Sequence, residues 1–204
     1  MSHYRIIRAI QVAIVIVSLA GGGTARAEVA LGASFGYTHL TYPDVPHYAN
    51  DAVGIPGSEE WYQPGIRVGY LAPGGRWDLN TDVGVMHRSG TSGNDATTIE
   101  LLPQIQANAR GRGELDAFVN GGVGIAYDKV PISSTSSMTA TRPVFGAGLG
   151  LRKSVSGGHG LLRFELRYDH LPKHVEKVSP YVTHTFLAVD MFSVKLGFDL
   201  LMAR

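Results

Sequence analysis

Residues Leu162 to Asp169 read LRFELRYD, in which large apolar side chains alternate with charged ones. Successive side chains of a β-strand point to opposite faces, so this stretch has one apolar face and one charged face. The apolar face consists of Leu162, Phe164, Leu166 and Tyr168, and the charged face of Arg163, Glu165, Arg167 and Asp169. The stretch therefore predicts a β-strand with an apolar environment on one side and charges of both signs on the other.

The same alternation recurs in seven other segments: residues 29–38, 66–70, 77–85, 99–108, 115–125, 146–152 and 192–199. In a soluble β-sandwich or lipocalin-like barrel, which is the rival interpretation, the apolar face lies inside and the polar face is solvated. Here the polar face instead alternates glycine with opposite charges, as in Gly146, Gly148 and Gly150 followed by Arg152. This pattern favours a narrow polar interior and apolar faces on the outside.

The gaps between these eight segments alternate long and short. The long gaps run from Thr41 to Glu60, Ser89 to Ala96, Lys129 to Thr141 and Leu171 to His184, and the short ones from Ala72 to Gly75, Gly111 to Gly113 and Ser156 to His159. In bacterial outer-membrane barrels the periplasmic turns are short and the extracellular loops are long. The sequence therefore predicts an all-β fold, an eight-stranded antiparallel up-and-down transmembrane β-barrel over residues 28–204.

The first 27 residues have the features of a secretory signal peptide: Arg5 and Arg8, an apolar stretch over residues 10–19, and the cleavage site Ala25-Arg26-Ala27. The apolar stretch is about half of the ~20 residues that a membrane-spanning helix needs. Cleavage leaves 177 residues with 15 basic and 17 acidic side chains, which gives no indication of a nucleic-acid partner. The chain has no cysteine, so it has neither a disulfide framework nor a cysteine for a lipid anchor.

The polar faces together supply charges for a packed barrel interior, since an eight-stranded barrel is only wide enough for side chains to fill. Buried charges must be paired and hydrogen-bonded. We expect the following residues to form an interior polar network: Arg67, Asp78, Asp82, Glu100, Asp116, Arg152, Arg163, Glu165, Arg167, Lys195 and Asp199. Glycines of the fifth and sixth segments make room for these long side chains. We therefore do not expect an open channel.

Aromatic residues cluster near the ends of the predicted strands, where the belts of a membrane protein lie. Those near the long gaps are Tyr37, Trp61, Tyr62, Tyr127, Tyr168 and Phe186, and those near the short gaps are Tyr70, Trp77 and Phe198. We expect these rings to mark the two membrane surfaces.

In strand pattern, loop rhythm and the terminal strand FSVKLGFDL (192–200), the chain resembles the OmpA/OmpX-type small outer-membrane barrels over essentially all of its mature length. Members of this broad group serve as structural barrels, adhesins or resistance factors, and a few are lipid-modifying enzymes. The resemblance thus implies a location in the outer membrane of a Gram-negative-type bacterium and leaves several functions open.

His87-Arg88-Ser89 ends the third segment with a His-x-Ser spacing that places both side chains on the outward face. The pair is similar to that of the outer-membrane lipid A deacylases, in which the serine hydroxyl attacks an ester and histidine acts as the base. That family has asparagine after the serine, where this chain has Gly90, and carries the motif later in the barrel. Asp95 or Glu100 would have to orient the histidine, and Glu100 is expected to face inward. The structural alternative is a strand end that runs into a polar turn.

His170, His174 and Glu176 in the fourth long gap are residue types that bind metals. Two histidines spaced by four residues share one face only on a helix, and Pro172 lies between them. We therefore expect a polar loop without a metal. The first long gap combines Asp44, Asp51, Glu59 and Glu60 with aromatic residues and is a candidate surface for calcium, sugar or a host.

The leading hypothesis from the sequence is an integral outer-membrane protein with a structural or surface-interaction role, acting through its extracellular loops and without a cofactor. Its expected partners are outer-membrane lipids and lipopolysaccharide, together with an extracellular ligand or host surface. The two alternatives are a lipid A-modifying hydrolase and a small pore. Fold alone does not choose among them, because function lies in particular sites.

Overall fold

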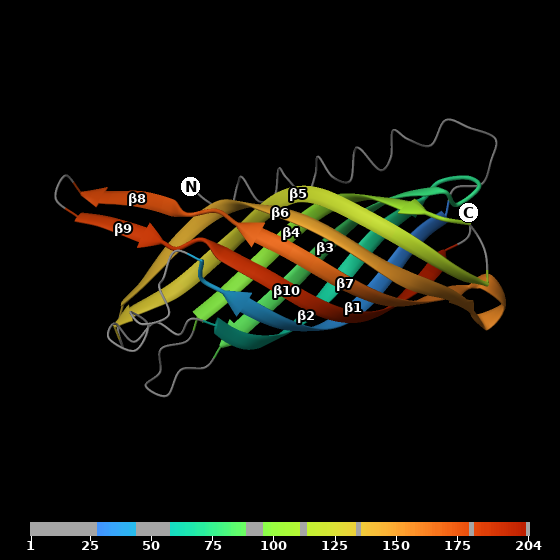
Figure 1. Cartoon of the computed structure of the whole chain (residues 1–204), viewed down its shortest axis with the longest axis horizontal. Helices are drawn as coiled ribbons and strands as arrows, with labels where there is room; N and C mark the ends of the chain where they lie inside the picture. Colours follow the sequence, from blue (N-terminus) through green and yellow to red (C-terminus); the bar gives the residue numbers. More distant parts are fainter. Residues whose placement is uncertain are drawn as a thin grey trace.

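The computed structural model describes residues 28–43, 58–88, 96–110, 114–133, 136–179 and 182–202. The predicted signal peptide, residues 1–27, lies outside these ranges and stays a prediction. Within them the chain is almost entirely β-strand, as the alternation predicts (Figure 1). In the same ranges no helix is long and apolar enough to cross a membrane.

Eight strands form a closed barrel, which confirms the predicted fold (Figure 1). Around the barrel they follow the order β1-β10-β7-β6-β5-β4-β3-β2, and every neighbouring pair is antiparallel. Their bounds are Glu28–Thr41 (β1), Ser58–Leu71 (β2), Trp77–Arg88 (β3), Ala96–Asn108 (β4), Leu115–Ser133 (β5), Ser136–Val155 (β6), Gly160–Leu171 (β7) and Val189–Met202 (β10).

The barrel closes where the first strand meets the last. In β1, Phe35 lies opposite Pro64 of β2 on one side and opposite Leu196 of β10 on the other. Every barrel strand thus has a hydrogen-bonded neighbour on both sides, although β2 and β3 pair only from Gly65–Gly84 to Leu71–Asp78. In a lipid environment this closure is necessary, because a bilayer core offers no water to unpaired backbone groups.

The two ends of the barrel differ. Three short connections lie at one end, where the backbone reverses through residues such as Gly74 (φ 81°) and Gly157 (φ 67°, within the 3-10 turn η1, Ser156–Gly158). Both barrel termini lie at this same end, since Glu28 pairs with Leu71 and Leu200 with Gly160. We call this the short-turn end and the opposite one the long-loop end.

Two of the predicted long loops contain regular structure, and in this respect the sequence interpretation was wrong. Strands β5 and β6 stay paired through the expected gap as far as Ser133 and Ser136. The fourth gap contains a separate hairpin, β8 (His174–Ser179) with β9 (Val182–Phe186), which projects at the left of Figure 1. The β-branched residues of these segments, such as Val130 and Thr139, favour a strand even where the sequence has no apolar alternation.

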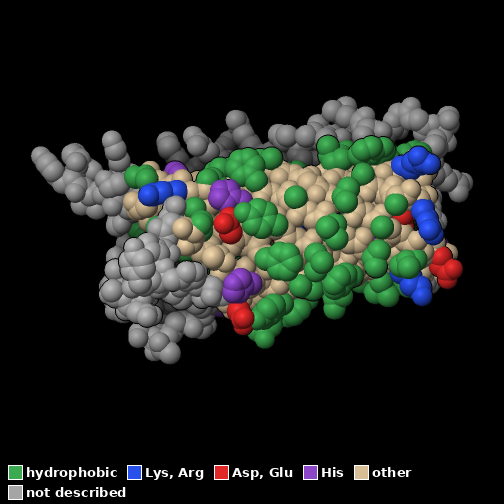
Figure 2. Space-filling model, viewed as in Figure 1, with side chains coloured by type: hydrophobic (Ala, Val, Ile, Leu, Met, Phe, Trp, Pro, Cys, Tyr) green, Lys and Arg blue, Asp and Glu red, His purple; other side chains and the backbone are tan. Residues whose placement is uncertain are grey.

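The outer face of the barrel is apolar between its ends. In β10 the outward side chains of Phe192, Val194, Leu196, Phe198 and Leu200 are all exposed, with Leu196 at 62%. Figure 2 shows hydrophobic side chains spread along this face and charged ones gathered toward its two ends. A soluble monomer rarely exposes a contiguous apolar patch larger than a few hundred Å². The surface is therefore suited to a bilayer.

Aromatic rings lie at both ends of the apolar face, with three exceptions to the prediction. Tyr37, Tyr62 and Tyr168 are exposed near the long-loop end, and Trp77 is exposed near the short-turn end. Trp61, Phe186 and Tyr70, which were expected in the belts, are instead buried, at 7%, 5% and 8% exposure. Trp61 lies on the inward face of β2, the face that also carries Gln63 and Arg67.

Candidate functional site

The barrel interior is the first candidate site, and its half toward the short turns is polar. Ten of the eleven residues expected in the interior network are buried, and the other, Asp82, has a side chain 15% exposed. The buried ones are Arg67, Asp78, Glu100, Asp116, Arg152, Arg163, Glu165, Arg167, Lys195 and Asp199.

A cluster of three arginines surrounds Glu165 in the middle of the barrel. Oxygens of this carboxylate lie 3.1 Å from Arg67, 3.5 Å from Arg163 and 3.4 Å from Arg167. Asp82 joins two of the same arginines, with its Oδ2 at 2.7 Å from Arg67 and 3.3 Å from Arg167. These ion pairs connect strands on different sides of the barrel, so they fill the lumen as well as neutralising it.

A second cluster lies nearer the short turns. Arg152 Nη1 is 2.7 Å from Asp78 Oδ2, and Arg152 Nη2 is 3.4 Å from Asp116 Oδ2. Gln106 and Asn108 also donate hydrogen bonds to Asp78, at 3.1 and 2.8 Å. The short-turn end of the lumen is therefore closed by hydrogen-bonded side chains.

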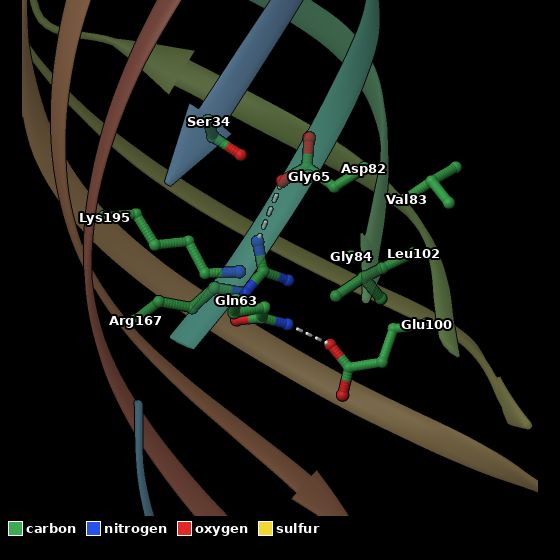
Figure 3. A pocket seen from close by; sticks show the side chains of 10 residues that line it. All are labelled: Ser34, Gln63, Gly65, Asp82, Val83, Gly84, Glu100, Leu102, Arg167 and Lys195. Carbon is green, nitrogen blue, oxygen red and sulfur yellow. Dashed lines mark hydrogen bonds and ion pairs between the residues drawn. The ribbon is translucent and has the colours of Figure 1, made fainter. Parts of the chain in front are cut away.

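Figure 3 shows the narrow void that remains among the polar side chains, with Arg167 and Lys195 reaching into it. At its edge Gln63 Nε2 donates a hydrogen bond of 2.8 Å to Glu100 Oε2. The void measures about 10 Å³, which is about the space that one water molecule requires. A void of this size gives no continuous path for ions.

Glycine makes this packing possible, as the sequence pattern predicts. A Cβ atom added to Gly148 would lie 2.9 Å from Glu165 Oε1, and one added to Gly146 would lie 2.5 Å from Arg167 Nη2. Atoms at such distances overlap. The long charged side chains of β7 thus occupy the space that the glycines of β6 leave open.

The predicted network left out several members of the interior, among them Asp169, which the alternation had placed on the charged face of its strand. Asp169 binds Arg167 Nε through both carboxylate oxygens at 2.8 Å. Asp128 and Arg142, which directly flank the expected gap from Lys129 to Thr141, form a buried ion pair of 2.6 Å. The alternation of the strand could have predicted Asp128 in the interior, because Asp128 follows Gly124 and Ala126 at two-residue spacing and therefore lies on the same inward face.

The other half of the interior, toward the long loops, is mainly apolar, whereas we expected a packed polar interior from the sequence. Its buried cluster consists of Leu40, Trp61, Met86, Ala96, Leu102, Ala126, Val144, Leu171, Val189 and Met191. These residues occupy inward positions that continue the polar faces of the same strands. We call the polar half of the interior, toward the short turns, the polar plug, and the apolar half, toward the long loops, the apolar cup.

The apolar cup forms a half-open cavity of about 260 Å³. All eight barrel strands contribute to its wall, and Phe186 of β9 adds a ring from the projecting hairpin. The ion pair of Arg142 and Asp128 lies in the same wall. This cavity is the second candidate site and is large enough to hold a small molecule.

The structure locates only part of the proposed His-x-Ser site. His87 lies on the outward face of β3, where its Nδ1 is 3.0 Å from Thr97 Oγ1. Ser89 and Asp95 lie outside the described residues. Glu100 is 3% exposed and points into the lumen, away from the outward face of His87, so it does not orient this histidine.

The histidines of the fourth gap have separate partners. His170 Nδ1 lies 2.6 Å from Asp190 Oδ1, which also accepts a hydrogen bond of 2.7 Å from Tyr168. The ring of His174 instead lies 6.3 Å from that of Phe186. Among the residues that the structure describes, no group of three or more His, Asp or Glu side chains is placed to hold a metal ion.

Solved structures with the same fold are small outer-membrane barrels. Neisserial surface protein A (NspA) matches with a TM-score of 0.65 at 12% identity, over 85% of this chain and 97% of that one. Ail, the attachment invasion locus protein of Yersinia pestis, in complex with the heparin analogue sucrose octasulfate, gives a TM-score of 0.52 at 10% identity, over 86% and 99% of the two chains. OprG of Pseudomonas aeruginosa gives 0.51 at 12% identity, over 90% and 99%.

No protein-family model matches this sequence, and no curated protein matches it significantly. The evidence for its class is therefore structural: a closed eight-stranded barrel, an apolar outer face and a polar interior toward the short turns. This chain has the fold of the small outer-membrane β-barrels of the OmpA/OmpX type.

Proposed function

We propose that this protein spans a bacterial outer membrane, closes its own lumen, and acts at its long-loop end in a structural or surface-interaction role. The observation that carries the proposal is the combination of an apolar outer face with a lumen blocked by paired charges. The outer face would contact outer-membrane lipids and lipopolysaccharide. Short turns are periplasmic in barrels of this kind, which would place the long-loop end outside the cell.

The closed lumen argues against the pore hypothesis. Four arginines, Arg67, Arg152, Arg163 and Arg167, extend into the lumen and meet carboxylates within 3.5 Å. Opening a path would separate such pairs, and an unpaired buried charge costs several kcal/mol. Purified protein in planar bilayers should therefore show little or no steady conductance, and a large stable conductance would refute the closed lumen.

The paired strands at the long-loop end support a surface role. The β5–β6 pairing extends to Ser133 and Ser136, and the β8–β9 hairpin adds a second projecting element. The strands of these hairpins extend beyond the level of the apolar face.

Adherence to host cells tests the surface role. We would compare bacteria expressing the unmodified protein with bacteria expressing a variant in which a short glycine linker replaces residues 174–186. The unmodified protein should increase adherence and the shortened one should lose the increase, while both keep the different gel mobilities of boiled and unboiled samples that a closed barrel gives. Adherence equal to that of cells without the protein would leave only the structural role.

A further inference from the structure

The apolar cup is separate from the polar side chains that block the lumen. Its cavity of about 260 Å³ lies on the barrel axis, with a contribution from each of the eight strands. The strands surround it, although β2 and β3 are not paired at this level, because their pairing ends at Gly65 and Gly84, before Trp61 and Met86 of the cavity wall. Leu102 belongs to the apolar cluster and also borders the polar void, so the plug forms the floor of the cup.

The charges in the cavity wall are neutralised within the protein. Asp128 accepts hydrogen bonds of 2.6 Å from Arg142 Nε and 2.6 Å from Thr98 Oγ1. Arg142 Nη1 donates a further bond of 2.6 Å to the carbonyl oxygen of Leu187. A charged ligand would have to compete with these bonds, so the cavity favours an uncharged occupant.

The remaining wall suits an aliphatic molecule. Met86, Met138 and Met191 line the cavity, and methionine side chains adapt to apolar ligands of different shape because they are flexible and polarizable. An apolar cavity of ~150 Å³ is already sufficient to bind benzene. The cavity here is larger, so it has room for a short alkyl chain.

We propose that this cavity binds a small, uncharged aliphatic molecule that enters from the long-loop end as a free ligand. The alternative source is an acyl chain inserted sideways from the bilayer between β2 and β3, whose pairing ends at Gly65 and Gly84, and the last experiment below distinguishes the two sources. The polar plug prevents passage to the other end, so the site is a binding cup. This inference goes beyond the structural or surface-interaction role.

The two tryptophans of the chain provide the test, because Trp61 lines the cavity and Trp77 faces outward near the short turns. The Trp77→Phe variant, in lipid nanodiscs, leaves Trp61 as the fluorophore. Terminally brominated octanol is the probe, since bromine quenches tryptophan on contact. We expect saturable quenching that unbrominated octanol reverses. Both barrel ends are accessible in nanodiscs, so the result does not depend on the orientation in the cell.

Two matched variants in the Trp77→Phe background locate the binding. Ala96→Phe adds a ring to the cavity wall and should abolish the saturable quenching. Ala147→Phe makes the same change on the exposed outer face and should leave it intact. If Ala96→Phe does not fold, reversal by unbrominated octanol still tests for a saturable site.

Nanodiscs made with chain-brominated phospholipid distinguish the two sources of an aliphatic chain. They should quench Trp77 in a Trp61→Phe variant and leave Trp61 of the Trp77→Phe variant unquenched. Quenching of Trp61 by the phospholipid would overturn the proposal in favour of a bilayer chain. Octanol quenching that never saturates, or that is equal in the Ala96→Phe and Ala147→Phe variants, would also overturn it.

Discussion

Replacing Leu196 with arginine should destabilise the barrel far more than the same change at Leu200. Both leucines lie on the outward face of β10, at 62% and 54% exposure, and neither packs in the interior. They differ in depth. Four residues span ~13 Å along a strand, which at a tilt of ~40° is ~10 Å along the membrane normal.

This difference in depth sets the expected magnitude. The apolar band of an outer-membrane barrel is ~25 Å tall, so ~10 Å carries a residue from near its middle to its edge. Leu196 lies between the aromatic positions Phe192 and Phe198, whereas Leu200 lies beyond Phe198 toward the short turns. We therefore expect Leu196→Arg to cost ~2–4 kcal/mol and Leu200→Arg ~0–1 kcal/mol.

Equilibrium unfolding by urea in phosphatidylcholine vesicles, followed by tryptophan fluorescence, measures both costs. The two variants share strand, face and chemical change, so they control for each other. Equal costs, or a larger cost at Leu200, would refute the assignment of this face to the bilayer.

Further predictions concern the interior. Arg163→Ala should cost ~3–5 kcal/mol, because it removes an ion pair from each of two buried carboxylates, Glu165 and Asp199. Arg76→Ala at the exposed turn should have little effect, and equal unfolding midpoints for the two variants would contradict the paired network. In planar bilayers Arg163→Ala should also show more frequent conductance events than the unmodified protein, and an unchanged record would mean that this arginine is not part of the plug. Gly150→Ala should destabilise the barrel, since a Cβ there would meet the Phe118 ring at 2.6 Å. Gly121→Ala should be neutral or stabilising by ~0.5–1 kcal/mol, because the nearest atom to its added Cβ would be at 3.6 Å. Urea unfolding that ranks the two glycine variants in the reverse order would contradict the inward placement of Gly150.

The outer face and the inward charges could be predicted because side chains alternate between the two faces along the whole length of a barrel strand. Once Leu166 faces outward, Arg163, Glu165 and Arg167 must face inward, whatever their partners are. The partners could not be predicted, because they depend on how the sheet closes. Arg67 and Glu165, which are 98 positions apart, meet at 3.1 Å only because the barrel brings β2 and β7 to a common axis.

The apolar cup escaped prediction for a different reason. Trp61 and Phe186 were assigned to the membrane belt by their nearness to the long gaps, although the parity of Gln63 and Arg67 already placed Trp61 inside. Asp128 and Arg142 lie where apolar alternation fades, so the strands were expected to end there. The strands, however, stay paired beyond the apolar band. At that level the outward residues need not be apolar, so the sequence lacks the alternation that identifies the inward residues.

The location and orientation of the barrel are tested most directly by labelling single cysteines with a membrane-impermeant maleimide. The chain has no cysteine, so each variant carries one thiol. Lys173 is exposed at the long-loop end and His159 is exposed at the short-turn end. In intact bacteria Lys173→Cys should be labelled, and His159→Cys should be labelled only after the outer membrane is permeabilised. Labelling of His159→Cys but not of Lys173→Cys in intact cells, or recovery of the unlabelled protein in the soluble fraction, would contradict a barrel that spans the outer membrane with its long loops outside.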